Sequence, residues 1–424
     1  MFEETTERDA AQGRPEMAPN APIYLDYQAT TPVDSRVLSA MLPYFQADFG
    51  NPHSVHHAYG ETAARGLEKA RGEVAALIGA EPREVIFTSG ATESNNTAIK
   101  GVARFYGALG KTHIIVPQTE HKCVLESCKR LAGEGFDITY LPVGTDGLVD
   151  LETLKEAIRP ETVLVSVMAV NNEIGVIQPL EAIGEVCRER GVTFHVDAAQ
   201  AVGKIPLDLR RLPVDLLSIS GHKLYAPKGI GALYVRRRPR ARLEPLIDGG
   251  GQERALRSGT VPVPLAVGLG AACRIAESEM EAETARLWAL HQRLRGALQE
   301  RVPAATFNGH PTARIPGNLN VTLPEVPAES LIAALPDVAI STASACSSAS
   351  VEPSYVLSAL GLSDTAAAQS VRIGLGRFTT PAEIDTASAR IAETAAALRG
   401  TDTQDSLVAA DGHGDGHGGG HGGI

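Results

Sequence analysis

Short apolar runs alternate along the chain with longer segments in which apolar residues recur at helical spacing. Residues 85–88, 113–116 and 163–170 are such runs and predict strands, whereas residues 61–78 and 180–190 have the spacing of amphipathic helices. This alternation predicts an α/β fold, with a mostly parallel sheet and helices on both of its faces. In such a sheet, ligands bind at the carboxyl ends of the strands.

The pattern changes after Pro262, where a long helix-forming stretch is followed by short strands and a last helix over 381–398. This change predicts a second, smaller α+β domain. Both ends of the chain are polar or rich in glycine, and such segments cannot bury a core. The predicted division is a disordered arm (1–21), a segment of the small domain (22–35), a large α/β domain (36–262), the small domain (263–400) and a disordered Gly/His-rich tail (401–424).

Composition and charge exclude several classes of function. The chain has 424 residues and a formal net charge of −11, which argues against nucleic-acid binding and against an anionic membrane as partner. It has no apolar run of about 18 residues and no signal-peptide pattern, so we expect a cytoplasmic protein. Its five cysteines are an odd number without metal-site spacing, and we expect reduced thiols, mostly buried.

One lysine follows a predicted strand on a short turn. Lys223 ends the sequence SGHK at 220–223, between the apolar runs 214–219 and 229–235. Partial desolvation at a strand end lowers the pKa of a lysine and frees its amine to attack a carbonyl carbon, as a Schiff-base lysine does. Most turn lysines simply face solvent, so this interpretation depends on the neighbouring residues.

Asp197 ends another apolar run, upstream of Lys223. Pyridoxal phosphate (PLP) needs a carboxylate that keeps its pyridine nitrogen protonated, so that the ring can accept electrons. An aspartate after a strand is also a common helix cap. Together, in this order, Asp197 and Lys223 resemble the site of fold-type I PLP enzymes.

Further polar residues follow other predicted strands. Residues 89–93 offer backbone N–H groups, a hydroxyl and a helix N-terminus to a phosphate, and Ser220 and His222 add two contacts, although the same residues also fit ordinary helix capping. His121 is placed to stack on the ring and shuttle protons. Gln200 is placed to bind the ring hydroxyl, and Asn172 to reach the cofactor or the substrate carboxylate. Each of these three is also an ordinary loop side chain.

Several motifs, in order over about residues 22–400, are similar to those of cysteine desulfurases of the NifS/IscS type, in the class V aminotransferase group. The resemblance implies PLP fold-type I, with a large domain built on a mostly parallel seven-stranded sheet plus a smaller α+β domain. The motifs are LDYQATTP (25–32), SGATESN (89–95), TEHK (119–122), NNEIG (171–175), SGHK (220–223), GGGQER (249–254), RSGT (257–260) and STASACSSAS (341–350).

The resemblance also implies a role for each residue of the site. Lys223 would bind PLP covalently and Asp197 would bind the pyridine nitrogen. Asn172 and Arg372 would take the substrate carboxylate, which suits the planar fork of an arginine. Thr260 would reach the phosphate of a second subunit, which implies a homodimer. The remaining cofactor contacts would be Ala91, Thr92, Ser220 and His222 at the phosphate, His121 on the ring and Gln200 at the ring hydroxyl.

Cys346 distinguishes a desulfurase from a generic aminotransferase. It lies in a stretch of small residues where a loop can move between a cofactor and a partner. The resemblance implies that Cys346 takes sulfur from L-cysteine as a persulfide, is a transient iron–sulfur ligand, and passes sulfur to an acceptor such as an iron–sulfur scaffold or a tRNA thiolation relay. Because only a thiolate reacts, Cys346 needs a proton acceptor, and both His121 and the substrate fit.

Two rival functions remain to be compared. A selenocysteine lyase or related PLP-dependent C–S lyase needs no enzyme persulfide, and the loop of Cys346 favours the desulfurase. A scaffold protein without catalysis would not need Lys223, Asp197 and Cys346 together. In the tail, His413, His417 and His421 suit Zn or Ni, and an unstructured solubilising tail fits them equally well.

Overall fold

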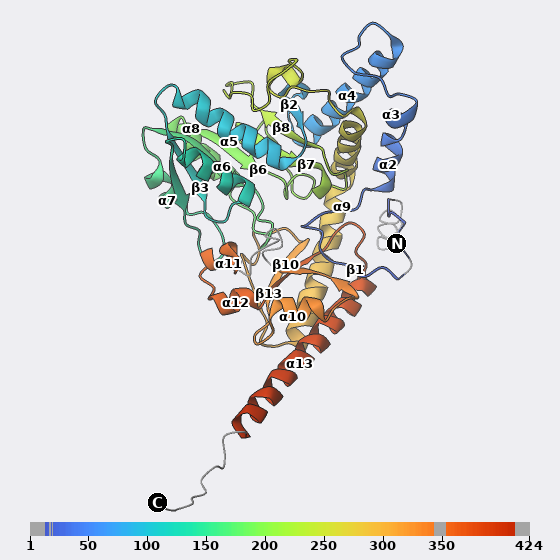
Figure 1. The fold of residues 1–424 in the computed structure, drawn as a ribbon, viewed down its shortest axis with the longest axis vertical. Helices are drawn as coiled ribbons and strands as arrows, with labels where there is room; N and C mark the ends of the chain where they lie inside the picture. The colour runs from blue at the N-terminus through green and yellow to red at the C-terminus, as the bar shows by residue number, and fades with distance from the viewer. Residues whose placement is uncertain (1–12, 17, 19, 343–352, 412–424) are drawn as a thin grey trace, which may run out of the picture.

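A seven-stranded mixed sheet forms the centre of the large domain in the computed structural model, which describes residues 13–16, 18, 20–342 and 353–411 (Figure 1). Strand β8 is antiparallel to both of its neighbours, and the other strand pairs are parallel. The predicted α/β fold with a mostly parallel sheet is therefore confirmed. The strand order is β2 (Val85–Thr88), β8 (Gly231–Val235), β7 (Leu216–Ser220), β6 (Thr193–Asp197), β5 (Thr162–Met168), β3 (His113–Pro117) and β4 (Asp137–Leu141).

Helices cover both faces of this sheet, because alternate side chains of a strand point to opposite faces. Ile86 packs with residues of α5 (Ala91–Gly107) and α6 (Lys122–Ala132), whereas Val85 and Phe87 pack in the core on the other face. That core includes residues of α4 (Ala58–Leu77), α7 (Leu151–Ala157) and α8 (Leu180–Arg190), and α2 (Ser35–Met41) adds Val37 and Met41. The short helix α3 (Pro43–Gln46) follows α2, and a 3₁₀ turn, η1 (Pro82–Glu84), precedes β2.

The small domain contains a second, antiparallel sheet with the strand order β12, β13, β10, β9. Strand β1 (Ile23–Tyr24) pairs in parallel with β11 (Val338–Ala339), so the N-terminal segment adds to this domain. The sheet packs on the ends of two long helices around a separate core. Its elements are β9 (Thr306–Phe307), β10 (Asn318–Thr322), α10 (Ala328–Ala333), β12 (Ser341–Thr342), α11 (Tyr355–Ala359), α12 (Asp364–Ala368) and β13 (Ser370–Gly374).

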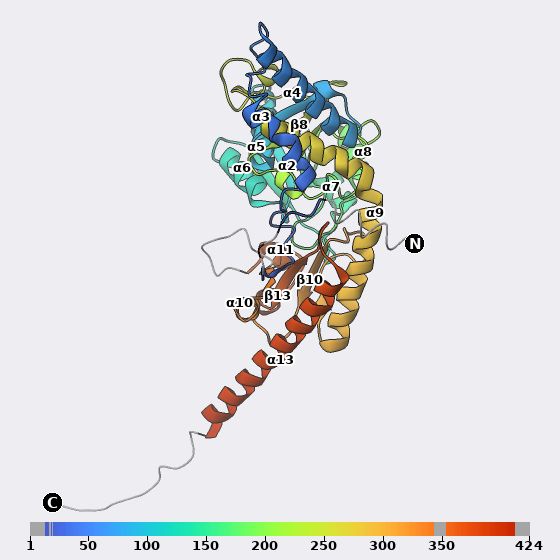
Figure 2. The same cartoon turned by 90° about the vertical axis from the view of Figure 1, so that its right-hand side faces the viewer.

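Helix α9 (Val263–Arg301) belongs to both domains. Its 39 residues run from the large domain to the small one, as Figure 2 shows. Its first part, through Ala276, packs in the large-domain core, and Leu287 to Leu298 pack in the core of the small domain. The cores therefore meet within α9 and not at residue 262, where the sequence placed the boundary. No proline or glycine lies between residues 271 and 295 to interrupt the helix.

The two ends of the described chain differ from the sequence-based expectation. Helix α13 (Pro381–Asp411) extends beyond residue 398, because the glycine-rich composition begins only at residue 412. Residues 412–424 lie outside the described part of the chain. Within the predicted disordered arm, Gly13 is buried and its carbonyl accepts a hydrogen bond from Ser35 N at 3.1 Å, while Arg14 pairs with Glu383 at 2.9 Å. None of the described helices is long and apolar enough to cross a membrane.

Candidate active site

A cavity of about 530 Å³ opens at the carboxyl ends of the parallel strands. It brings together every predicted site residue that the structure describes, except Thr260. Cys346 lies outside the described residues, as do His413, His417 and His421. The predicted residues that line the cavity are Ala91, Thr92, His121, Asn172, Asp197, Gln200, Ser220, His222, Lys223 and Arg372.

Lys223 reaches the cavity from a 3₁₀ turn, η2 (Gly221–Lys223), that follows β7 directly. Its Nζ donates hydrogen bonds to the main-chain oxygens of Gln28 at 2.5 Å and Ala29 at 2.7 Å. These carbonyls belong to the LDYQATTP segment, which the sequence singled out without showing its position. The segment thus connects the amine of the large domain to the N-terminal part of the small domain.

Asp197, at the end of β6, is buried, and each of its carboxylate oxygens accepts a hydrogen bond. Its Oδ2 accepts from Asn95 Nδ2 at 2.7 Å and its Oδ1 from Ala199 N at 2.9 Å. These hydrogen bonds fix the orientation of the carboxylate at the cavity, where it could meet a ring nitrogen. Sequence reasoning missed Asn95. Its place one turn beyond Ala91 on the same helix is the signal that could have found it.

The N-terminus of α5 points into the cavity at Gly90. No side chain caps this helix, so its first N–H groups remain for a ligand. Gly90 has φ 151°, a conformation that favours glycine. A Cβ on Gly231 would lie 2.6 Å from the Cα of Gly90, so glycine at 231 lets β8 approach the loop closely. The α5 terminus consequently lies beside Ser220, at the end of β7.

His222 is neutral in this environment. Burial, followed by the positive charges of Lys223 and Lys228, lowers the pKa of His222 to about 4. Its Nδ1 lies 3.1 Å from Thr30 Oγ1, and its carbonyl accepts from Thr31 N at 3.0 Å. The ring can therefore hydrogen-bond a phosphate without adding a charge.

His121 is the N-cap of α6, and this position fixes its tautomer. The backbone N–H of Cys123 donates to His121 Nδ1 at 3.2 Å, so the neutral ring carries its proton on Nε2. Cys123 Sγ lies 3.1 Å from the same Nδ1 and accepts from Asn95 Nδ2 at 3.2 Å. The sequence treated Cys123 as one of several ordinary thiols, whereas it lines the cavity.

Gln200 is buried between two partners. Its Nε2 donates to Gln28 O at 2.8 Å and its Oε1 accepts from Lys204 Nζ at 2.6 Å. Lys204 was not predicted as a site residue. It lies on the side of Gln200 away from the main cavity, in a small cavity of about 30 Å³ that Lys223 also lines.

Arg372, on β13, already has protein partners. It is 1% exposed and pairs with Asp26 at 2.8 Å, and its Nη1 donates to Asn172 O at 3.2 Å. Its Nε is buried without a partner in the described structure. Asn172 is thus held through its main chain, and it lines the cavity. The predicted pair of carboxylate-binding residues lies together, but Asp26 is a competing carboxylate that the sequence did not reveal.

Thr260 is the exception, because it is exposed and does not line the cavity. Its segment is fixed to the large domain by a buried ion pair, in which both guanidinium Nη atoms of Arg71 lie 2.8 Å from the carboxylate of Glu253. Arg257, three residues before Thr260, pairs at 2.9 Å with Glu93 in the first turn of α5. Burial disfavours the charged form of Glu93, but the hydrogen bonds from Arg257 and Ser89 hold its pKa below the usual range.

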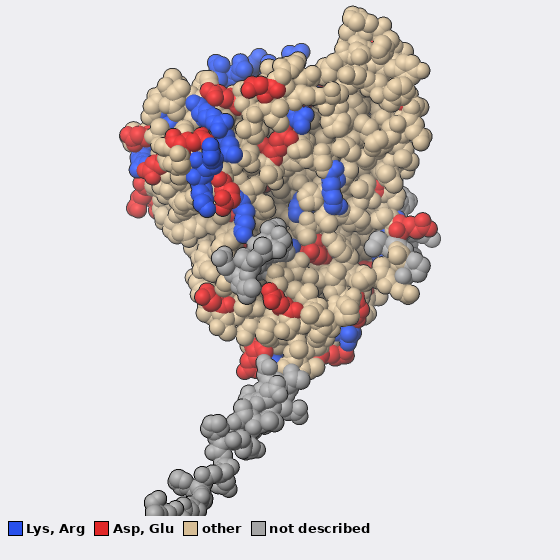
Figure 3. Space-filling view, viewed as in Figure 1, with Lys and Arg blue, Asp and Glu red and all other residues tan. Residues whose placement is uncertain are grey.

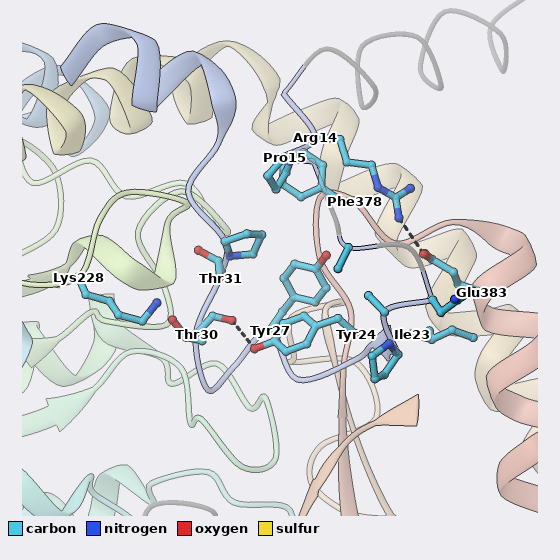
Figure 4. Close-up of a pocket in the computed structure, with 15 residues that line it drawn as sticks. Arg14, Pro15, Ile23, Tyr24, Tyr27, Thr30, Thr31, Lys228, Phe378 and Glu383 are labelled. Carbon is cyan, nitrogen blue, oxygen red and sulfur yellow. Dashed lines mark hydrogen bonds and ion pairs between the residues drawn. The ribbon is translucent and has the colours of Figure 1, made fainter. Parts of the chain in front are cut away.

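A second cavity, of about 400 Å³, lies between the N-terminal segment and the small domain (Figure 4). Its walls are mainly apolar and aromatic, from Tyr24, Tyr27 and Phe378. Tyr24 Oη donates to Thr30 O at 2.9 Å, the bond drawn in Figure 4. Lys228 borders both this cavity and the first one. The predicted chemical groups do not line the second cavity.

The donor set of the first cavity fits PLP. An uncapped helix N-terminus, a hydroxyl and a neutral imidazole suit the phosphate, the hydrogen-bonded carboxylate of Asp197 suits the pyridine nitrogen, and Lys223 supplies the amine. The described residues contain no group of three or more His, Cys, Asp or Glu that could hold a metal ion.

Comparison with known proteins identifies the family of this arrangement. The family model of the class-V aminotransferases matches residues 23–386. The chain belongs to this family. Within it, the chain is of the cysteine desulfurase type: it is 62% identical over 367 residues to a mitochondrial cysteine desulfurase of Arthroderma benhamiae, covering 86% of this chain and 73% of that protein. This class-V aminotransferase is also 59% identical over 372 residues to the human cysteine desulfurase, covering 88% and 81% of the two chains.

Bacterial relatives and solved structures agree with this result. Cysteine desulfurase IscS of Rickettsia felis is 58% identical over 367 residues, covering 87% of this chain and 89% of that protein. A NifS-like protein of known structure superposes with a TM-score of 0.82 at 38% identity, covering 88% and 98% of the two chains. A structure described as SspA in complex with cysteine has a TM-score of 0.74 at 40% identity, covering 84% and 99%. The resemblance found in the sequence is confirmed.

Proposed function

We propose that this class-V aminotransferase is a PLP-dependent cysteine desulfurase that converts L-cysteine to L-alanine and passes the sulfur to Cys346 as a persulfide. The observation that carries the proposal is the single cavity in which Lys223, Asp197 and Arg372 meet around the N-terminus of α5. The identity to named desulfurases supports the same activity. Iron–sulfur cluster assembly is the proposed use of the sulfur, with tRNA thiolation as a further destination.

PLP, when bound, would accept the electron pair that a proton leaves behind on the substrate α-carbon. Lys223 would hold the cofactor, and its amine would be the base that takes that proton. Asp197 would keep a proton on the ring nitrogen, and Asn95 orients Asp197 for this task through its hydrogen bond. The carboxylate of L-cysteine would bind at Arg372 and Asn172.

The sulfur transfer itself balances without an external oxidant. The Cys346 thiolate attacks the sulfur of the substrate L-cysteine, and the C–S bond of the substrate breaks. The substrate carbon then takes up a proton to give L-alanine. The persulfide on Cys346 retains the transferred sulfur until a reductant or an acceptor protein removes it. In the neutral form of His121 the proton lies on Nε2, so that nitrogen would serve this site as a proton donor.

The proposed enzyme is a homodimer. Several large apolar side chains are exposed near α2, α3 and the start of α4, and Figure 3 shows this corner of the large domain almost free of charged residues on the face drawn. Such a patch favours a protein partner. Thr260 is exposed on a segment that the Arg71–Glu253 pair holds in place, as a residue that serves a second subunit requires. The patch residues are Leu38, Leu42, Phe45, Phe49, Val55 and Tyr59.

Two further expectations stay proposals. Sulfur-acceptor proteins such as an iron–sulfur scaffold are the proposed partners, and a pull-down with the persulfide-loaded enzyme would identify them. A cytoplasmic location is the second expectation. The similar proteins include relatives that are named mitochondrial and also bacterial relatives. Fractionation of the source cells would therefore test the location.

The test of the function is formation of alanine and sulfide from L-cysteine in the presence of a reductant, with wild type and Cys346→Ala compared. The proposal predicts turnover in the wild type and loss of both products in the variant, with the PLP absorbance unchanged. If the variant kept full turnover, the function would be that of a C–S lyase and not that of a desulfurase. Cys187→Ala is the matched control, because Cys187 is buried in the core and away from the cavity.

A further inference from the structure

Lys204 is a half-buried cation that no part of the proposed function uses. It follows Gln200 by four residues, and its Nζ donates to Gln200 Oε1 at 2.6 Å. Burial, followed by the charge of Lys223, lowers the pKa of Lys204 to about 7, while Glu283 on α9 raises it. A neutral amine still donates a hydrogen bond, so the contact with Gln200 persists on both sides of pH 7.

This contact decides which end of the Gln200 amide faces which partner. In its ammonium form Lys204 donates and does not accept, and its Nζ donates to Gln200 Oε1, so the oxygen of the amide points to Lys204. The amide nitrogen then points the other way and donates one hydrogen to Gln28 O at 2.8 Å. Its second hydrogen is left for the cavity that Gln200 lines. The flipped amide would set its oxygen against the Gln28 carbonyl, and two acceptors repel each other.

The carbonyl of Gln28 links the Lys204–Gln200 contact to the amine of Lys223. Gln28 O accepts from Lys223 Nζ at 2.5 Å as well as from Gln200, so both of its lone pairs are used. Lys204, Gln200, the Gln28 carbonyl and Lys223 thus form one continuous hydrogen-bonded chain. Lys204 and Lys223 also border the same cavity of about 30 Å³, which has room for a water molecule.

We propose that Lys204 is a positioning residue, which fixes the Gln200 amide with its nitrogen toward the cavity and so presents a hydrogen-bond donor there. The donor meets the ring hydroxyl of the cofactor. This inference rests on the proposed function, because only a bound ring oxygen gives the donor a use. Lys204 itself touches neither the cofactor nor the substrate.

The pH dependence of the visible absorption band of bound PLP tests this role without reference to turnover. The ring oxygen of bound PLP shares a proton with the nitrogen of Lys223, and a hydrogen bond donated to this oxygen competes with that proton. Loss of the donor therefore raises the midpoint, which is the pH at which the change in the absorption band is half complete. The variants are Lys204→Met, which has no donor, Lys204→Arg, which keeps a donor-only cation, Gln200→Ala, and the double variant Lys204→Met/Gln200→Ala.

The midpoint should rise by about one pH unit in Lys204→Met and in Gln200→Ala, which corresponds to the loss of one hydrogen bond to a charged group. It should stay at the wild-type value in Lys204→Arg, and the double variant should match Gln200→Ala. Lys204→Gln, which is polar and one atom too short for the contact, gives the same test in case the apolar variant does not fold.

Two results would overturn the inference. One is an unchanged midpoint in both Lys204→Met and Lys204→Gln, and the other is a double variant whose shift is the sum of the single shifts. Failure of the proposed function has a different signature, because a wild-type protein that binds no PLP would show no visible band at all. A wild type with a normal band and normal cysteine turnover, beside unshifted Lys204 variants, contradicts the role of Lys204 alone.

Discussion

Asp26 and Arg372 form an ion pair at 2.8 Å beside the cavity, and this pair connects the proposed substrate site to the small domain. Asp26 forms an isolated bridge with Gly374, two residues beyond Arg372 on β13. Its second carboxylate oxygen accepts from Ser341 Oγ at 2.6 Å. Asp26 therefore orients the guanidinium of Arg372 and compensates its charge, as the proposed binding of a substrate carboxylate would require.

Replacing Asp26 should destabilise the protein, since it leaves the guanidinium of Arg372 buried and uncompensated. We expect Asp26→Ala to lower the free energy of unfolding by about 2 kcal/mol, below the loss usual for fully buried pairs because Asp26 keeps some contact with solvent. Asp26→Asn should lose less, because its amide oxygen still accepts a hydrogen bond from Arg372. Urea unfolding of the three proteins measures both values. Equal stability of Asp26→Ala and wild type would contradict a structural role for the pair.

Glu173 should make stability depend on pH. Burial raises its pKa to about 7, although Ser354 Oγ donates to its carboxylate and Arg372 and His121 lie near. The folded state thus binds a proton more tightly than the unfolded state, whose glutamate has a pKa near 4.5. The contribution of Glu173 to the free energy of unfolding is fully present below the pKa of the unfolded state and is lost as the pH rises toward 7.

Glu173→Gln removes this proton and keeps an acceptor for Ser354. Relative to wild type, the free energy of unfolding of the variant should increase by on the order of 2–3 kcal/mol between pH 5 and pH 8. Urea unfolding at the two pH values gives this difference. A difference that does not change with pH would show that Glu173 ionises in the folded protein as it does in the unfolded chain.

The cysteines should differ sharply in reactivity. Burial raises the pKa of Cys128 and of Cys187 to about 12, and it also raises the pKa of Cys273, so these thiols should resist alkylation in the native protein. Cys123 is partly exposed at the cavity and should react. Mass spectrometry after iodoacetamide treatment gives the modified sites, and added PLP should protect Cys123. Labelling of Cys128 or Cys187 at the rate of Cys123 would be inconsistent with this core.

The sequence predicts elements well where local signals mark their ends. Helix α8 ends at Arg190 as predicted, because Gly191 adopts the left-handed conformation, with φ 63°, that stops a helix. The sequence assigned the whole of helix α9 to the small domain, whereas its first part packs in the large-domain core, because no residue within the helix marks the change from one core to the other. The expectation of mostly buried thiols is confirmed for Cys128, Cys187 and Cys273 among the described residues.

The site shows the same division between local and long-range information. Parallel topology places all strand ends on one edge, so Asp197, His121 and Lys223 could be predicted to meet. Their partners could not be predicted, because these lie far away in sequence: Gln28 contacts Lys223 across 195 residues, and Asn95 contacts Asp197 across 102. No periodicity encodes such contacts, which arise only when elements far apart in the sequence pack together.

The central claim is that PLP is bound covalently to Lys223. Among the described residues, Lys223 and Lys228 line the main cavity, and Lys204 lines the cavity of about 30 Å³ that Lys223 also borders. Borohydride reduction of the PLP-loaded protein, followed by peptide mass spectrometry, fixes the cofactor on the lysine that holds it. The account predicts the reduced adduct on Lys223 alone, and its absence in Lys223→Ala. An adduct on Lys204 or Lys228 in the wild type, or no adduct on any of the three, would contradict it.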